Sequence, residues 1–133
     1  MPESDKRKVL IVDEHPDNRR ITRFMLRDTE AEIIEATSVK EALGVLETIS
    51  GISLIITELP LGHNMWAGLD IIEATRGYPG VTVLVYTTHI MQNAEQRARD
   101  AGATEFIPKP SPNFGQVRAA ITRLLESGTA NLH

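Results

Sequence analysis

The chain has 133 residues, of which 41% are hydrophobic and 24% are charged, and its net charge at pH 7 is −4. This length fits one domain with one hydrophobic core, and the composition argues against a disordered or membrane-embedded protein. The acidic balance disfavours direct binding to nucleic acid, and the absence of cysteine excludes disulfides and thiolate metal sites.

Five short runs rich in β-branched residues recur along the chain, each followed by a turn signal and a segment of helical period. They predict five strands, at Lys8–Asp13, Ala31–Ala36, Ile52–Glu58, Val81–Thr87 and Glu105–Pro108. The first, third and fourth runs are almost continuously hydrophobic, which is typical of parallel strands covered on both faces. The second run alternates, so we expect it at an edge of the sheet.

The first two helices follow the first two strands. Pro16–Asp28 carries proline in its first turn and places Ile21, Phe24 and Met25 on one apolar face. The second helix begins at Ser38, because Ser38 and Glu41 form a capping-box pair. Its apolar residues then repeat at helical spacing: Val39, Ala42, Leu43, Leu46 and Ile49.

Three further helices are predicted in the second half of the chain. The third runs from about Leu69 to Arg76, and the fourth ends before Gly102. The fourth places four residues on one side: Met91, Ala94, Ala98 and Ala101. The fifth, Asn113–Ser127, buries a stripe formed by Phe114, Val117, Ile121, Leu124 and Leu125.

Strict alternation of strands and helices predicts an α/β fold with a doubly wound parallel sheet, whose ligands bind beyond the carboxyl ends of the strands. These ends carry acids, hydroxyls and an ammonium: Asp13 to His15, Glu58 to His63, Thr87 to His89, and Lys109. Acids that converge there suit a divalent cation. A threonine hydroxyl and a lysine suit a phosphoryl or carboxylate oxygen.

Four motifs at these strand ends resemble the receiver domain of two-component response regulators. They are VLIVDEHPDNRR, LIITELPLG, VLVYTTH and AGATEFIPKP, and the likeness covers Lys8 to about Leu125. The resemblance implies a flavodoxin-like receiver fold, with five parallel strands in the order 2-1-3-4-5 and five flanking helices. It also implies a signalling protein of a phosphorelay rather than an enzyme.

The resemblance assigns roles to several side chains. Asp13 and Glu14 match the acidic pair that binds Mg²⁺, and Glu58 with the Pro60 carbonyl would complete that site. Thr87 and Phe106 match the switch residues, and Lys109 matches the lysine of the phosphate pocket. Receivers commonly have a cis bond before the proline that follows this lysine, so we expect one at Pro110.

The sequence departs from the family at the phosphoacceptor, where Glu58 replaces aspartate. The longer side chain shifts the carboxylate by about one bond length, and such misplacement can slow a reaction by on the order of 10²-fold. We therefore expect an atypical pseudo-receiver that binds proteins without phosphorylation and holds Mg²⁺ weakly. The alternative is a phosphate-accepting response regulator, phosphorylated by a histidine kinase with Mg²⁺. The following loop also departs, with Gly62 in place of proline and about two additional residues before Gly68.

Three histidines and the tryptophan lie in loops at the same end of the sheet. A transition-metal site formed by His15, His63 and His89 is conceivable, but solvent-exposed loop positions explain them better. Trp66 has two open interpretations of equal weight. It is either an exposed interface anchor or a residue packed over its own loop.

The predicted domain spans residues 8–127, with tails at 1–7 and 128–133. The helix 4, strand 5 and helix 5 face, which the family uses most often, is the expected protein-binding surface. The partners include a histidine kinase or a second copy of the chain, but neither nucleic acid nor membrane. A cytoplasmic location is expected, because no apolar run is long enough to span a bilayer and no signal region follows the polar N-terminus. A third hypothesis is that this chain is the receiver portion of a longer protein that carries an output domain.

Overall fold

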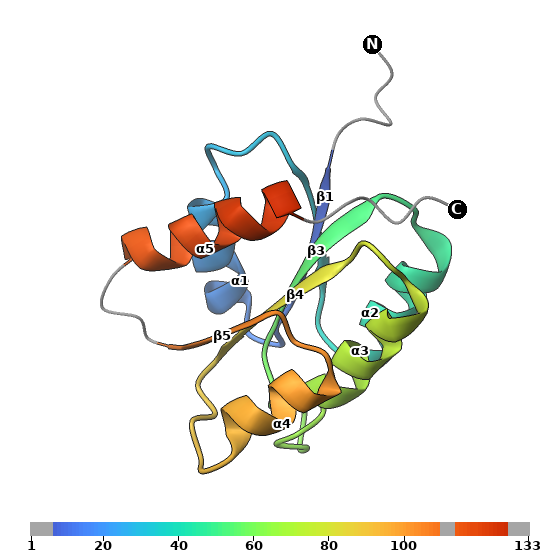
Figure 1. Ribbon diagram of the computed structural model, residues 1–133, viewed down its shortest axis with the longest axis vertical. Coiled ribbons are helices and arrows are strands. Elements are labelled where there is room, and N and C mark those ends of the chain that lie inside the picture. The colour runs from blue at the N-terminus through green and yellow to red at the C-terminus, as the bar shows by residue number, and fades with distance from the viewer. Residues whose placement is uncertain (1–6, 110–113, 128–133) are drawn as a thin grey trace.

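The computed structural model describes residues 7–109 and 114–127. Its sheet has five parallel strands in the order β2-β1-β3-β4-β5 (Figure 1). Their bounds are β1 Lys8–Val12, β2 Glu32–Ala36, β3 Ile52–Thr57, β4 Thr82–Thr87 and β5 Glu105–Pro108. The predicted architecture is confirmed, and β2 lies at an edge as its alternating pattern indicated.

Helices cover both faces of this sheet. Their bounds are α1 Pro16–Met25, α2 Val39–Thr48, α3 Gly68–Ala74, α4 Ala94–Ala101 and α5 Phe114–Ser127. Figure 1 shows α1 and α5 on one face and α2, α3 and α4 on the other. Neighbouring strand residues alternate between the two hydrophobic layers, so Val9 packs on the α1 and α5 side and Leu10 on the opposite side.

The buried faces of α1 and α5 differ from the prediction. In α1 the buried side chains are Thr22 and Met25, whereas Ile21 and Phe24 are exposed. Phe114, predicted in the buried stripe of α5, is also exposed, although the other four members of that stripe are buried. The reason is that the rotation of each helix is set by its packing against the sheet and its neighbour, which its own apolar pattern does not encode.

Three helix limits also differ. Helix α1 ends at Met25, and the chain then forms turns up to Asp28. Helix α3 ends at Ala74 and is followed by one 3₁₀ turn, Thr75–Gly77. Helix α4 begins at Ala94 because Asn93 is left-handed, with φ of 72°. Met91 therefore precedes the helix and is exposed, contrary to the prediction.

The cap of α2 confirms its predicted start. Ser38 Oγ accepts a hydrogen bond of 3.2 Å from the Glu41 amide. The Glu41 carboxylate accepts hydrogen bonds from the Thr37 hydroxyl at 2.7 Å and the Thr37 amide at 2.6 Å. These two hydrogen bonds, the side-chain one first, lower the pKa of Glu41 below its ordinary value of 4.5.

Candidate functional site at the carboxyl ends of the strands

A buried charged triad lies at the ends of β1, β3 and β5. Lys109 Nζ lies 2.8 Å from Asp13 Oδ2 and 3.3 Å from Glu58 Oε2. The side chains of Asp13 and Glu58 are 5% exposed and that of Lys109 is 9% exposed. The predicted phosphate-pocket lysine and two of the predicted acids thus meet, because parallel strands end at the same edge of the sheet.

Both carboxylate oxygens of Glu58 have hydrogen-bond donors. Oε1 accepts from the Leu59 amide at 2.9 Å. Oε2 accepts from the Thr88 amide at 3.2 Å and the Thr88 hydroxyl at 3.3 Å, and it also faces Lys109. The carboxylate is therefore fixed in place by three elements of the fold.

The hydroxyl that contacts Glu58 belongs to Thr88, which the sequence reasoning did not assign. Thr87 is fully buried, and its Oγ1 accepts a hydrogen bond of 2.9 Å from the His89 amide. The backbone carbonyl of Thr87 accepts from the Lys109 amide at 2.8 Å, which aligns the ends of β4 and β5. Two consecutive threonines at a strand end were the available signal, because neighbouring strand residues point to opposite sides.

The acidic pair after β1 does not converge on one point. Asp13 Oδ1 accepts from the His15 amide at 2.9 Å, whereas Glu14 is exposed and accepts from the Gly62 amide at 2.9 Å. Among residues 7–109 and 114–127, no three His, Asp or Glu side chains form a group that could hold a metal ion. As arranged, the side chains predicted to bind Mg²⁺ do not fit a divalent ion, because the Lys109 ammonium lies between Asp13 and Glu58.

The loop after β3 is fixed by a close approach to α3. A Cβ atom at Gly68 would lie 2.3 Å from the Glu58 carbonyl oxygen, so only glycine fits there. The Gly68 amide donates to the Leu59 carbonyl at 2.8 Å. Within the loop, which includes Pro60, Asn64 Oδ1 accepts from the Trp66 amide at 2.8 Å. This packing positions the end of the strand that carries Glu58.

The three loop histidines have different environments. His15 and His63 are exposed, as predicted. The prediction is wrong for His89, which is 3% exposed. Its ring meets Trp66 edge-on, with ring centroids 4.4 Å apart and planes at 85°. Trp66 is half-buried by this contact and by the Arg97 guanidinium, 3.8 Å from the indole centroid.

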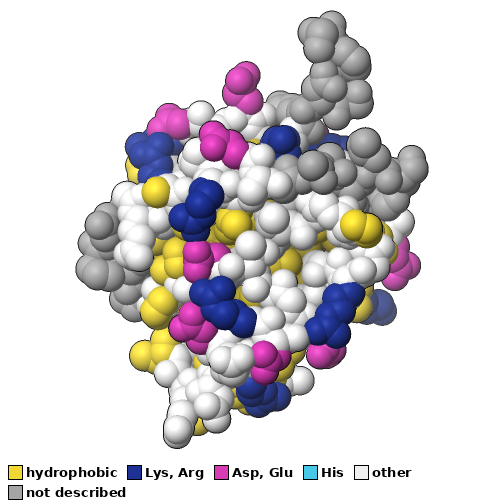
Figure 2. Space-filling view, viewed as in Figure 1, with side chains coloured by type: hydrophobic (Ala, Val, Ile, Leu, Met, Phe, Trp, Pro, Cys, Tyr) yellow, Lys and Arg dark blue, Asp and Glu magenta, His cyan; other side chains and the backbone are white. Residues whose placement is uncertain are grey.

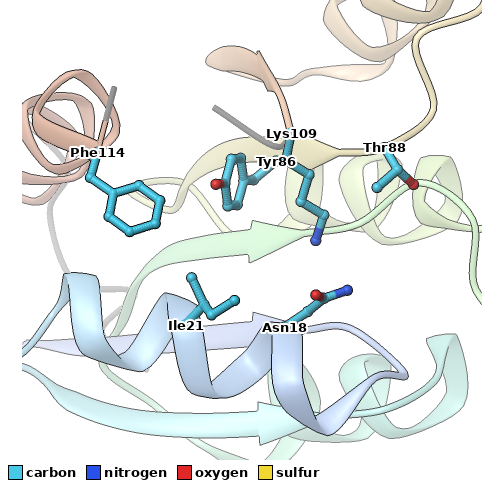
Figure 3. Close-up of a pocket in the computed structure, with 6 residues that line it drawn as sticks. All are labelled: Asn18, Ile21, Tyr86, Thr88, Lys109 and Phe114. Carbon is cyan, nitrogen blue, oxygen red and sulfur yellow. The ribbon is translucent and has the colours of Figure 1, made fainter. Parts of the chain in front are cut away.

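The two sides of the triad differ in character. On the α1 and α5 side, an apolar cavity of about 190 Å³ lies beside Lys109, between Ile21, Tyr86 and Phe114 (Figure 3). On the α4 side, Phe106 is partly buried against the core. The predicted cis bond at Pro110 lies outside the described residues.

The family model for the response regulator receiver domain matches residues 9–122. The chain belongs to this receiver family. An uncharacterized 14.6 kDa protein of Leptolyngbya boryana is 30% identical to the receiver over 105 residues, covering 77% of this chain and 78% of that protein. The methanol utilization control regulatory protein MoxX of Paracoccus denitrificans is 32% identical over 123 residues, covering 91% of this chain. The receiver spans only 54% of the length of MoxX.

Solved structures agree with the fold of this receiver. The receiver domain protein of Methanospirillum hungatei superposes with a TM-score of 0.81 at 23% identity, covering 92% of this chain and 95% of that one. Receivers and response regulators are signalling proteins rather than enzymes, which confirms the prediction from sequence. No helix in the described parts of the chain is long and apolar enough to cross a membrane.

Proposed function

We propose that this receiver signals as a pseudo-receiver in a two-component system, by binding proteins independently of phosphorylation. The observation that carries the proposal is the engagement of both Glu58 oxygens by the Leu59 amide, the Thr88 donors and Lys109. A phosphoacceptor must direct one free oxygen at the phosphorus atom, in line with the leaving group. In Glu58 neither oxygen is free, and the carboxylate is buried.

The same contacts support partial mimicry of a phosphorylated receiver. Glu58 directs a negative charge at Lys109 and accepts hydrogen bonds from the loop after β4. A phosphoryl group brings about −1.5 to −2 charge and three acceptor oxygens, whereas glutamate brings one charge and two oxygens. We expect the carboxylate to bias the switch residues Thr87 and Phe106 incompletely toward their active arrangement.

The proposed protein-binding surface is the face formed by α4, β5 and α5. Ile90 and Met91, in the loop before α4, are 67% and 65% exposed, and they border a hollow lined also by Phe106. Figure 2 shows charged side chains of both signs over this face, with hydrophobic side chains exposed between them. A mixed surface of this kind suits a protein partner, whether a histidine kinase, an effector or a second copy of the chain.

Three further properties of the domain concern its bounds, its location and its affinity for Mg²⁺. We place the receiver in residues 8–127 of a cytoplasmic protein, with residues 1–7 and 128–133 as tails. Weak Mg²⁺ binding by Asp13, Glu14, Glu58 and the Pro60 carbonyl requires displacement of Lys109 from the two buried carboxylates.

The alternative function is phosphorylation of Glu58 by a histidine kinase, and intact mass measurement separates the two. With a small phosphodonor and Mg²⁺, we expect the chain to keep its mass and Glu58→Asp to gain one phosphoryl group, because the other pocket residues are present. Glu58→Ala is the control for labelling elsewhere. A stoichiometric phosphoryl adduct on the unmodified chain, absent from Glu58→Ala, would establish the alternative.

A further inference from the structure

The loop between β4 and α4, residues 88–93, buries one side chain, that of His89, and contacts Glu58 through another, that of Thr88. Five of its six residues are exposed, and only His89 is buried. Among the other five, Ile90 and Met91 are large hydrophobic residues that are 67% and 65% exposed. A loop with so few buried side chains depends strongly for its order on His89, its buried anchor.

The anchor is a ring contact rather than a hydrogen bond of the imidazole Nε2. His89 Nε2 is buried and has no hydrogen-bond partner among the described residues. The ring instead packs edge-on against Trp66, which belongs to the loop after β3. Arg97, from α4, places its guanidinium over the same indole. The stack Arg97, Trp66 and His89 therefore joins three segments that are separate in sequence.

This stack adjoins the contact between the loop and Glu58. Thr88, the residue before His89, donates both its amide and its hydroxyl to Glu58 Oε2. The His89 amide donates to Thr87 Oγ1, which fixes the backbone between the two contacts. A displacement of the His89 backbone that separates its ring from Trp66 would also displace Thr88 from the carboxylate, because the two residues are adjacent in the chain.

We propose that the stack of Arg97, Trp66 and His89 is a latch that holds the loop 88–93 closed over Glu58 and couples the carboxylate to α4. Coupling of this kind is reciprocal, so loss of the stack loosens the Thr88 contact and loss of the carboxylate loosens the stack. The inference rests on the Glu58 to Thr88 contact and not on the mode of signalling. Its tests therefore do not depend on the phosphodonor experiment.

The first arm measures exchange of the Thr88 amide hydrogen by NMR. We expect His89→Ala to accelerate Thr88 exchange by roughly three- to tenfold, and Arg97→Ala, at an exposed position, by about two- to fivefold. His89→Phe should stay close to the parent, because it keeps an aromatic ring without ring nitrogens. Ile90→Ala is the matched control in the same loop and should leave exchange unchanged.

The comparison with core amides separates a latch from a general loss of stability. The amides of Leu10 and Ile55 are in fully buried residues of β1 and β3, and their exchange should not rise with that of Thr88. Equal acceleration at all three amides, or no acceleration at Thr88, would overturn the proposal. If His89→Ala does not fold, Arg97→Ala decides the result alone.

The second arm follows the coupling in the opposite direction. Trp66 is the only tryptophan, so its fluorescence reports on the stack without labelling. We expect Glu58→Ala to shift Trp66 emission toward that of a more solvated indole, and Ile90→Ala to leave it unchanged. Identical emission spectra for Glu58→Ala and the parent would overturn the coupling between the carboxylate and the stack.

Discussion

Lys109 lies closer to Asp13 than to Glu58, at 2.8 Å against 3.3 Å, and all three side chains are largely buried. One ammonium therefore offsets two carboxylates, each of which keeps an additional backbone amide donor: His15 for Asp13 and Leu59 for Glu58. Burial of a charge is tolerated only where partners replace its water. The chemistry of this site consequently depends on Lys109 more than on either acid alone.

Lys109→Met should lower the free energy of unfolding by roughly 3 kcal/mol, because it leaves two buried carboxylates without their shared cation. Urea denaturation at pH 7 measures this change. The double variant Asp13→Asn with Lys109→Met should recover part of the loss. The control is Lys8→Met, since Lys8 donates to the exposed Ser50 carbonyl and has no ion pair with a described residue. Equal effects of the two lysine substitutions would show that the triad contributes nothing specific.

Mg²⁺ should bind the parent chain weakly and Lys109→Met more tightly, because the ammonium and the divalent ion compete for the same carboxylates. Calorimetric titration compares the two, and Asp13→Asn should bind less Mg²⁺ than the parent. No heat from the parent at millimolar Mg²⁺ would mean that the ammonium has replaced the cation. Tighter binding by the parent than by Lys109→Met would contradict the competition.

Glu58→Gln should shift the side-chain populations of Phe106, because it removes the charge that faces Lys109 and weakens acceptance from Thr88. NMR of ring-labelled phenylalanine measures these populations. Phe24 is exposed, and it serves as the internal control whose signal should not change. If the Phe106 populations and the affinity for an identified partner are both unchanged, the Glu58 carboxylate does not drive the switch. The domain would then be a binding surface with one fixed conformation.

The contribution of Glu41 to the start of α2 should depend on pH. Hydrogen bonds from Thr37 lower the pKa of Glu41 in the folded state, so the ionised form stabilises the fold. That contribution is complete above the ordinary pKa of 4.5 and is lost as pH falls through the lowered value. Urea midpoints of the parent and Glu41→Gln should converge in this acidic range. A constant difference between the two curves down to pH 3 would contradict the assignment.

The sequence by itself predicted the strand order through its family motifs, and the strands themselves through local patterns. Continuous apolar runs indicated the central strands, and the Ser38 and Glu41 pair indicated the start of α2. It also predicted that Asp13, Glu58 and Lys109 would meet, since all three follow parallel strands. The strands and the helix start depend on residue type and spacing within a short segment, which can be read directly from the sequence. The meeting of the three side chains depends in addition on the strands being parallel.

Only the tertiary structure decided which faces and partners these segments use. It turned Ile21 and Phe24 of α1 outward, buried His89, and assigned the contact with Glu58 to Thr88. It also directed Glu14 to the Gly62 amide, away from the other acids. Each outcome depends on the rotation of a helix or the path of a loop, which are set by contacts between segments far apart in sequence. No local pattern encodes those contacts, because the free energy of each contact depends on both segments together and not on either one alone.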